Sequence, residues 1–195
     1  MKEILDTINI QNMATQYNFP YSAIIEIITK CNFVCEHCYI PEHIEEMKYK
    51  EIINIIDQLY ELGAFEITLT GGEIALHSSF MDIVSYIRKK GLSLVLMSNV
   101  SLFSESMIKE LAKLHINSVS TTLFSMDNQI NDSITKYTNS AETVLKNVLL
   151  LKKYGIKVDI KVPIMKKNYE GYSKIAYFCK NNNIPINYSV AITKR

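Results

Sequence analysis

The most constraining feature of this sequence is the regular alternation of short apolar runs with longer amphipathic segments. Each short run is rich in β-branched residues, as buried strands are, and each longer segment has apolar residues at helical spacing. A strand–helix–strand order predicts parallel strands joined by right-handed crossovers. The expected strands are 23–29, 65–70, 92–97, 118–124, 157–164 and 186–191, and the expected helices are 49–62, 79–90, 104–114, 140–154 and 169–181.

The connections between these segments favour a single domain. No Pro-, Gly- or Ser-rich linker interrupts the alternation, so we expect residues 1–22 to form an N-terminal lead-in and residues 23–195 one α/β core with a single parallel sheet. Periodicity does not decide whether that sheet stays open or rolls into a partial barrel. In either form, ligands bind at the carboxyl ends of the strands.

Charge and composition exclude several classes of protein. The 195 residues carry 21 basic and 20 acidic side chains, without the basic excess typical of proteins that bind nucleic acid or anionic membranes. The longest apolar runs, such as 93–97 and 148–151, are far too short to span a bilayer. The N-terminal segment is polar, unlike a signal peptide. We expect a cytoplasmic protein with no nucleic-acid or membrane partner.

Three of the four cysteines stand within eight residues, directly after the first predicted strand. Cys31, Cys35 and Cys38 have the spacing CxxxCxxC, and clustered cysteines in a chain without an export signal favour metal or redox chemistry over disulfides. Three thiolates can hold three corners of a [4Fe–4S] cube, whereas most such clusters use four cysteines. The spacing therefore predicts a cluster with one iron open to a small molecule.

Zinc is the competing metal for this loop. The three cysteines, together with either His37 or His43, would complete a closed Cys₃His site. Structural zinc loops usually combine two cysteine pairs from separated positions, and this sequence has no second pair. Inert buried cysteines are disfavoured by the polar neighbours Asn32, Glu36 and His37. The spacing favours the cluster and leaves zinc as the alternative.

The segment from Glu26 to Tyr39 resembles the cluster segment of radical S-adenosylmethionine (radical SAM) enzymes, most of all those that modify ribosomally made peptides or mature sulfatases. The resemblance covers almost the whole chain and implies a partial (β/α)₆ barrel. It also implies that Cys31, Cys35 and Cys38 hold a [4Fe–4S] cluster whose open iron is chelated by S-adenosylmethionine. Tyr39 would lie near the adenine of that cofactor, and the alternative is an aromatic side chain packed on the barrel rim.

Gly71-Gly72-Glu73 follows the second predicted strand and resembles the GGE motif of the same family, which binds the amino group of S-adenosylmethionine. Glycines allow the backbone to approach a ligand closely, and a carboxylate complements an ammonium group. Taken alone, the motif is also compatible with a strand-to-helix turn that places Glu73 near a helix N-terminus. Its position downstream of the cysteine loop favours cofactor binding.

Two further strand ends resemble family motifs. Ser98-Asn99 ends the third strand, where polar side chains would contact the methionyl carboxylate or the ribose, although Val100 replaces a common glycine. The segment 122–125 resembles the motif of the fourth strand, and Thr122 retains a hydroxyl group for a cofactor contact. Hydroxyl groups at strand ends often cap helices, which is the alternative at both places.

Five other residues have open roles. Ser140 either caps a helix or contacts a ligand, and Asp159 and Lys161 face either the barrel lumen or solvent. Asn168 resembles an asparagine that recurs in the peptide-modifying branch. Cys179 stands beside aromatic residues in a predicted helix, a context typical of an inert buried thiol.

The resemblance implies a radical enzyme. In this family, one electron from an external donor of the flavodoxin or ferredoxin type reaches the cluster, and S-adenosylmethionine is cleaved to a 5′-deoxyadenosyl radical that abstracts hydrogen from the substrate. The fourth and fifth strands most resemble those of enzymes that act on peptides or proteins. Two alternatives stay open: a stand-alone activase or transferase of the same family, and a non-catalytic zinc or scaffold protein. Relatives commonly continue into a domain with auxiliary clusters, so we expect a fragment or a chain that acts with a partner.

Overall fold

The computed structural model describes residues 2–40 and 44–190, and its six strands form one parallel sheet in the order β1-β2-β3-β4-β5-β6. The strands are β1 (Ser22–Ile28), β2 (Glu66–Gly71), β3 (Ser93–Met97), β4 (Ser118–Thr122), β5 (Lys157–Pro163) and β6 (Ile186–Ser189). The helices are α1 (Lys2–Tyr17), α2 (Tyr49–Glu61), α3 (Phe80–Lys89), α4 (Glu105–Lys113), α5 (Asn128–Thr135), α6 (Ser140–Lys153) and α7 (Tyr172–Asn181), with two 3₁₀ turns, η1 (Ile74–Leu76) and η2 (Tyr169–Gly171).

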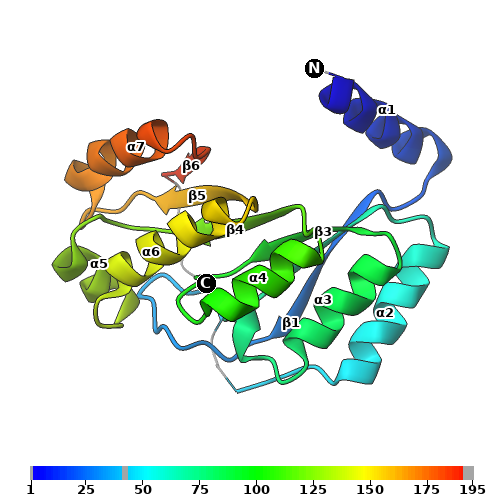
Figure 1. Cartoon of the computed structure of the whole chain (residues 1–195), viewed down its shortest axis with the longest axis horizontal. Coiled ribbons are helices and arrows are strands. Elements are labelled where there is room, and N and C mark those ends of the chain that lie inside the picture. Colours follow the sequence, from blue (N-terminus) through cyan, green and yellow to red (C-terminus); the bar gives the residue numbers. More distant parts are fainter. Residues whose placement is uncertain (1, 41–43, 191–195) are drawn as a thin grey trace.

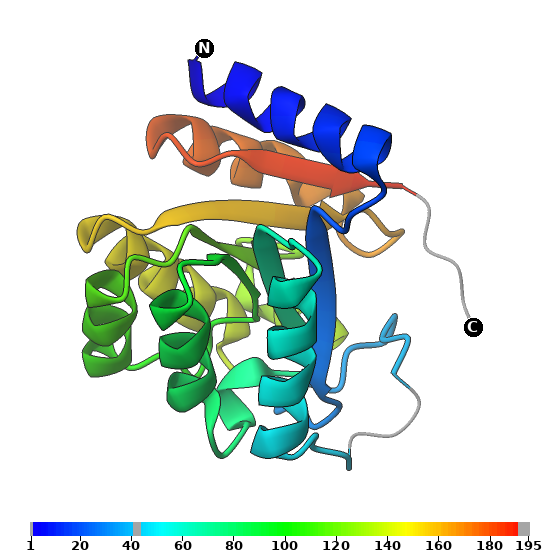
Figure 2. The ribbon, with the colours of Figure 1, turned by 90° about the vertical axis from the view of Figure 1, so that its right-hand side faces the viewer.

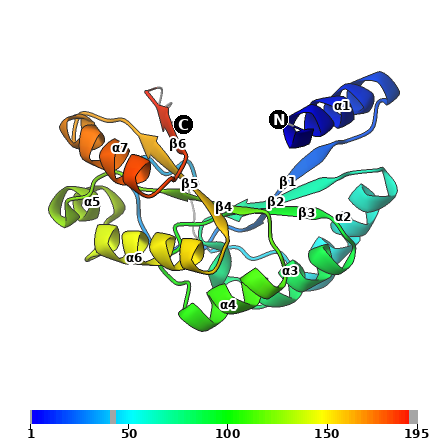
Figure 3. The ribbon, with the colours of Figure 1, turned by 45° about the horizontal axis from the view of Figure 1, so that its top comes forward.

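The sheet is curved and covered by helices on one face (Figure 1). Helices α2, α3, α4 and α6 lie beneath it, while the opposite face is open between β1 and β6 (Figure 3). Figure 2 shows the twist of the sheet, with β1 steeply inclined to β6. Within the described residues β1 and β6 do not pair, so the sheet forms a partial barrel, as predicted.

The hydrophobic core fills the space between the sheet and its helices. Alternate strand residues, such as Ile67 and Leu69 on β2, point toward the helices and are fully buried. Ile52 and Ile56 on α2 meet them with the i, i+4 spacing that defines one helix face. The same pattern recurs along the sheet, which explains why apolar periodicity located these elements. Further buried members are Ile83, Ile87, Leu94, Leu96, Ile108, Leu111, Val119, Val144, Val148 and Ile160.

All six predicted strands and all five predicted helices are present, with ends shifted by a few residues, but two helices were not predicted. Helix α5 lies in a segment that we expected to be a polar loop, because Asn, Ser and Thr are weak helix formers. Its N-cap Asp127 accepts a hydrogen bond from the Gln129 amide, and its C-cap Lys136 is left-handed, with φ 58°. Helix α1 occupies most of the predicted lead-in, where the division at residues 1–22 and 23–195 stays a prediction.

The segment after the cysteine loop covers the free edge of β1. Glu46 forms an antiparallel bridge with Ile28, and the Met47 amide donates to the Ile27 carbonyl at 3.0 Å. The His77 imidazole, buried beside η1, lies 2.8 Å from the Met47 carbonyl through Nε2. These bonds fix where the chain returns from the cysteine loop to α2. None of the described helices has the length and hydropathy needed to cross a lipid bilayer.

Candidate functional site

A cavity of about 250 Å³ lies at the carboxyl ends of the strands and gathers the predicted site residues. It is lined by every residue that the sequence assigned to a cofactor, except Glu73. These residues come from loops that follow four different strands, so the parallel sheet brings together segments far apart in the sequence. The lining residues are Cys31, Phe33, Cys35, His37, Cys38, Tyr39, Ile40, Thr70, Gly71, Gly72, Met97, Ser98, Asn99, Ser120, Thr122, Phe124 and Lys161.

None of the three thiols of this cavity forms a disulfide, and their charges act on one another. Cys31 and Cys35 are partly buried, and Cys38 is exposed. Burial raises the pKa of the Cys31 thiol; burial, together with the Cys31 and Cys38 thiols, raises the pKa of Cys35 to about 12. Three thiolates would repel one another here, so a bound cation is required to hold them deprotonated. The site therefore fits a metal centre.

The spacing of possible ligands bears on which metal centre this is. Among the residues that the structure describes, no three His, Cys, Asp or Glu side chains are placed to hold one metal ion. The zinc alternative needs a fourth ligand beside the three cysteines, which His37 or His43 would have to supply. The His37 ring packs against Phe124 with centroids 4.9 Å apart, and its buried Nδ1 has no hydrogen-bond partner. His43, the other candidate zinc ligand, lies outside the described residues.

Gly71 and Gly72, at the end of β2, contact the segment that joins β1 to Cys31. The Gly72 amide donates to the Ile28 carbonyl at 2.8 Å, and the Glu73 amide donates to the Lys30 carbonyl at 2.8 Å. A Cβ atom on Gly71 would lie 2.1 Å from the Ile28 carbonyl oxygen, and one on Gly72 would lie 2.3 Å from the Lys30 oxygen. We expected these glycines to allow backbone approach to a ligand. In the structure, the absence of their side chains lets the backbone lie against the carbonyl oxygens of Ile28 and Lys30, next to the cysteine loop.

The Glu73 carboxylate is fully buried and does not line the cavity. It accepts hydrogen bonds from the Ser98 hydroxyl at 2.7 Å and from the Asn99 and Ala75 amides at 2.8 and 3.0 Å. Burial raises the pKa of Glu73, while these hydrogen bonds act in the opposite direction. This geometry favours a positioning role over the expected direct contact with an ammonium group, because the carboxylate is occupied in holding the third strand end in place.

Ser98 and Asn99 connect the third strand end to the cysteine loop. The side-chain Nδ2 of Asn99 lies 3.8 Å from the Cys31 sulfur and donates a hydrogen bond to the Asn32 side-chain oxygen at 3.0 Å. Val100 adopts φ 56°, a left-handed conformation that favours glycine and is rare for a β-branched residue. Its amide donates to the Ser98 hydroxyl at 2.8 Å. The Ser98 side chain therefore helps to hold the turn at Val100.

The structure settles the position of the residues with open roles. Lys161 lines the cavity, and Asp159, on the same face of β5, accepts a hydrogen bond from the Ser120 hydroxyl at 2.8 Å. Ser140 is buried in a network with Asp132 and Asn131, away from the cavity. Two others are also structural: Asn168 bonds to the Phe124 and Pro163 carbonyls, and Cys179 lies in the core. Tyr39 is half-exposed on the rim, where its hydroxyl donates to Glu26 at 3.0 Å.

A sequence model of the Radical SAM superfamily matches residues 25–179, which run from within β1 through the cysteine loop and strands β2 to β5 into α7. The chain belongs to the radical SAM superfamily. This membership confirms the family predicted from the cysteine and GGE motifs, and with it the two cofactors of the family, a [4Fe–4S] cluster and S-adenosylmethionine.

Several known proteins are similar to this radical SAM chain. It is 27% identical over 160 residues to the antilisterial bacteriocin subtilosin biosynthesis protein AlbA of Bacillus subtilis, covering 80% of this chain and 36% of AlbA. It is 28% identical to the tungsten-containing aldehyde ferredoxin oxidoreductase cofactor-modifying protein of Pyrococcus furiosus, covering 80% of this chain and 47% of that protein. Streptococcus suis SuiB, solved with its precursor peptide SuiA, has the same fold, with a TM-score of 0.77 and 20% identity over 94% of this chain and 45% of SuiB. The chain thus spans less than half the length of these relatives.

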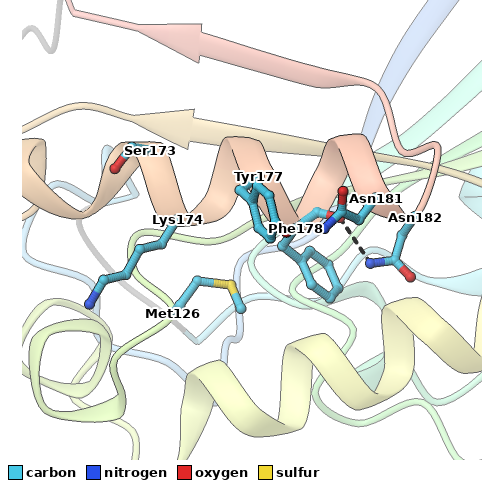
Figure 4. Close-up of a pocket in the computed structure, with 7 residues that line it drawn as sticks. All are labelled: Met126, Ser173, Lys174, Tyr177, Phe178, Asn181 and Asn182. Carbon is cyan, nitrogen blue, oxygen red and sulfur yellow. Dashed lines mark hydrogen bonds between the residues drawn. The ribbon is translucent and has the colours of Figure 1, made fainter.

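A second concavity is not part of the radical SAM site. It measures about 530 Å³ and lies in the helical layer, between α7 and the segment before α5. Figure 4 shows Lys174, Tyr177 and Phe178 on α7 above Met126. Its lining residues include no thiol, carboxylate or imidazole group. The chemistry-bearing side chains therefore gather at the strand ends, where ligands of parallel sheets bind.

Proposed function

We propose that this chain is the catalytic core of a radical SAM enzyme that cleaves S-adenosylmethionine reductively and abstracts hydrogen from a peptide or protein substrate. The observation that carries the proposal is the convergence of the CxxxCxxC thiols with Gly71, Gly72 and the Ser98–Asn99 turn on one cavity. When bound, the cluster and S-adenosylmethionine supply a 5′-deoxyadenosyl radical that takes hydrogen from the substrate.

The residues of the cavity divide into metal ligands and cofactor contacts. Cys31, Cys35 and Cys38 would hold the cluster. The backbone at Gly71 and Gly72 lines the cavity and would bind the amino group of S-adenosylmethionine, while Glu73 holds the Ser98 turn in place. The polar side chains of Ser98, Asn99 and Thr122 would contact its carboxylate or ribose, and Tyr39 would pack against the adenine.

The remaining assignments follow from the chemistry of the site. The first electron comes from an external one-electron donor of the flavodoxin or ferredoxin type. Cysteines outside disulfides and an oxygen-sensitive cluster are suited to a reducing compartment, so we place the protein in the cytoplasm. Residues 23–195 form the core that performs this reaction, and residues 1–22 lead into it.

A ribosomally made peptide, or a side chain of a protein, is the proposed substrate. Two of the similar proteins support this class, because AlbA is named for bacteriocin biosynthesis and SuiB was solved with a precursor peptide. A stand-alone activity on another substrate is the second candidate, because the Pyrococcus relative is named as a cofactor-modifying protein. Both candidates use the same cavity and differ only in what the radical attacks.

Metal analysis after anaerobic reconstitution tests the proposal. We expect about four irons and four labile sulfides per chain, with loss of both in Cys35→Ala. Cys179→Ala is the matched control, because this thiol is buried in the core and should leave the iron and sulfide content unchanged. About one zinc per chain without sulfide would contradict the proposal and support the zinc alternative.

The substrate class needs a separate measurement. If a short peptide gene lies beside the gene for this chain, its deuterated product should transfer deuterium to 5′-deoxyadenosine and change in mass. Deuterium-free 5′-deoxyadenosine and an unmodified peptide would favour the second candidate while leaving the radical chemistry intact.

A further inference from the structure

Three loops meet at one carboxylate beside the cysteine motif. Glu36 stands between Cys35 and Cys38 and accepts hydrogen bonds from the Lys136 ammonium at 2.8 Å and the Lys167 ammonium at 2.7 Å. Lys136 is the C-cap of α5, and Lys167 lies in the loop between β5 and η2. We call these three residues the Glu36 triad. In the sequence, at least 100 positions separate Glu36 from either lysine.

The position of the cysteine loop does not depend on these charges alone. The Val34 amide donates to the Thr135 carbonyl at 2.9 Å, and the Glu36 amide donates to the Ile134 carbonyl at 3.0 Å. The Phe33 ring, which is buried, packs against Tyr137 with centroids 4.8 Å apart. The end of α5 therefore holds the loop through backbone bonds and packing, so a change of charge at either lysine should leave the loop in place.

The Glu36 triad places a net positive charge beside two thiols. One carboxylate, that of Glu36, pairs with the two ammonium groups of Lys136 and Lys167. The reduction potential of an iron–sulfur cluster depends on net charge, hydrogen bonds to sulfur and solvent exposure. An adjacent positive charge favours the form that has gained an electron.

We infer that the Glu36 triad raises the reduction potential of the bound cluster, with Lys136 and Lys167 as positioning residues that supply the charge. The inference rests on the proposed function, because it requires the cluster on Cys31, Cys35 and Cys38. It gives a role to α5, whose C-cap carries one of the two lysines. Neither lysine lines the cavity, so both act through the cysteine loop.

A redox titration of the reconstituted full chain, followed by electron paramagnetic resonance, tests this inference. Lys136→Met and Lys167→Met should each shift the midpoint potential to a more negative value, and the double variant should shift it further. Lys136→Arg and Lys167→Arg should restore the potential, because the positive charge is kept. The shift should shrink as ionic strength rises, since the lysines are half-exposed.

The controls separate charge from structure. Lys113→Met removes an exposed lysine that pairs with Glu110. This pair lies at the end of α4, just before β4 begins and thus away from the carboxyl ends of the strands, so the potential should stay unchanged. Unchanged potentials in the Lys136 and Lys167 methionine variants would overturn the inference, as would equal shifts in the methionine and arginine variants. A wild-type chain that binds no cluster would instead overturn the proposed function and the inference with it.

Discussion

At the scale of single residues, the site depends on side chains that hold other groups in place. Glu73 illustrates this, since its carboxylate bonds to Ser98 and Asn99 instead of lining the cavity. A side chain at Gly72 would clash, because the carbonyl oxygens of Thr29 and Lys30, just after β1, lie where its Cβ atom would stand. The GGE motif was recognisable in the sequence, but these contacts were not, because they depend on how closely two loops approach in space.

Gly72→Ala should disrupt the cysteine loop. Its Cβ would meet the Lys30 and Thr29 carbonyl oxygens at 2.3 and 2.5 Å, so the backbone next to Cys31 must move, at a cost of about 1–3 kcal/mol. We expect lower thermal stability together with loss of the reconstituted cluster. Gly91→Ala is the control: its φ of +78° costs about 1–2 kcal/mol, but no atom lies within 4 Å of the new Cβ. A cluster retained in Gly72→Ala would show that the close approach is dispensable.

Glu46 should make stability sensitive to acid. Hydrogen bonds from the Ser78 hydroxyl and amide, and then from Lys30, lower the pKa of Glu46 to about 2 from 4.5. Because the folded-state pKa is depressed, this stabilisation is complete above about pH 4.5 and is lost as the pH falls toward 2. Urea unfolding between about pH 5 and pH 2 should show a larger loss for the wild type than for Glu46→Gln. Parallel curves for the two proteins would exclude this contribution.

At the scale of elements, helix α5 shows what periodicity cannot reveal. The predicted strands and helices carry long apolar faces, and their burial against the sheet determines where they form. Helix α5 has only eight residues and two apolar positions, Ile130 and Ile134, so its sequence has the composition of a loop. It forms because Asp127 caps it and because Asn131 connects it to its neighbours. Such contacts are set by the assembled fold.

Asn131→Ala should loosen α5 and the cysteine loop with it. The buried Asn131 side chain accepts hydrogen bonds from the Phe124 and Ser125 amides, both at 3.0 Å. Its removal leaves these buried donors unpaired, which costs about 1–3 kcal/mol for each group. Gln129→Ala, at an exposed position of the same helix, should change stability by less than about 0.5 kcal/mol. Chemical denaturation of both variants measures the difference, and equal stabilities would contradict the role of Asn131.

At the scale of the whole molecule, the order of strands explains why the site forms. Consecutive parallel strands send every following loop to the same edge, so the cysteine loop, the GGE motif and the Ser98–Asn99 turn converge there. That convergence was predictable from the alternation of strands and helices. The contacts between the loops were not, because the Glu36 triad joins residues from three separate connections.

The central claim is that the three thiols of this cavity support reductive cleavage of S-adenosylmethionine. Its most direct test is the amount of 5′-deoxyadenosine formed by the reconstituted chain under anaerobic, reducing conditions. We predict formation by the wild type and by Cys179→Ala, and none by Cys35→Ala, because Cys35 lies in the cavity and Cys179 does not. Equal formation by Cys35→Ala and the wild type, or none by a wild type that holds a complete cluster, would contradict the claim.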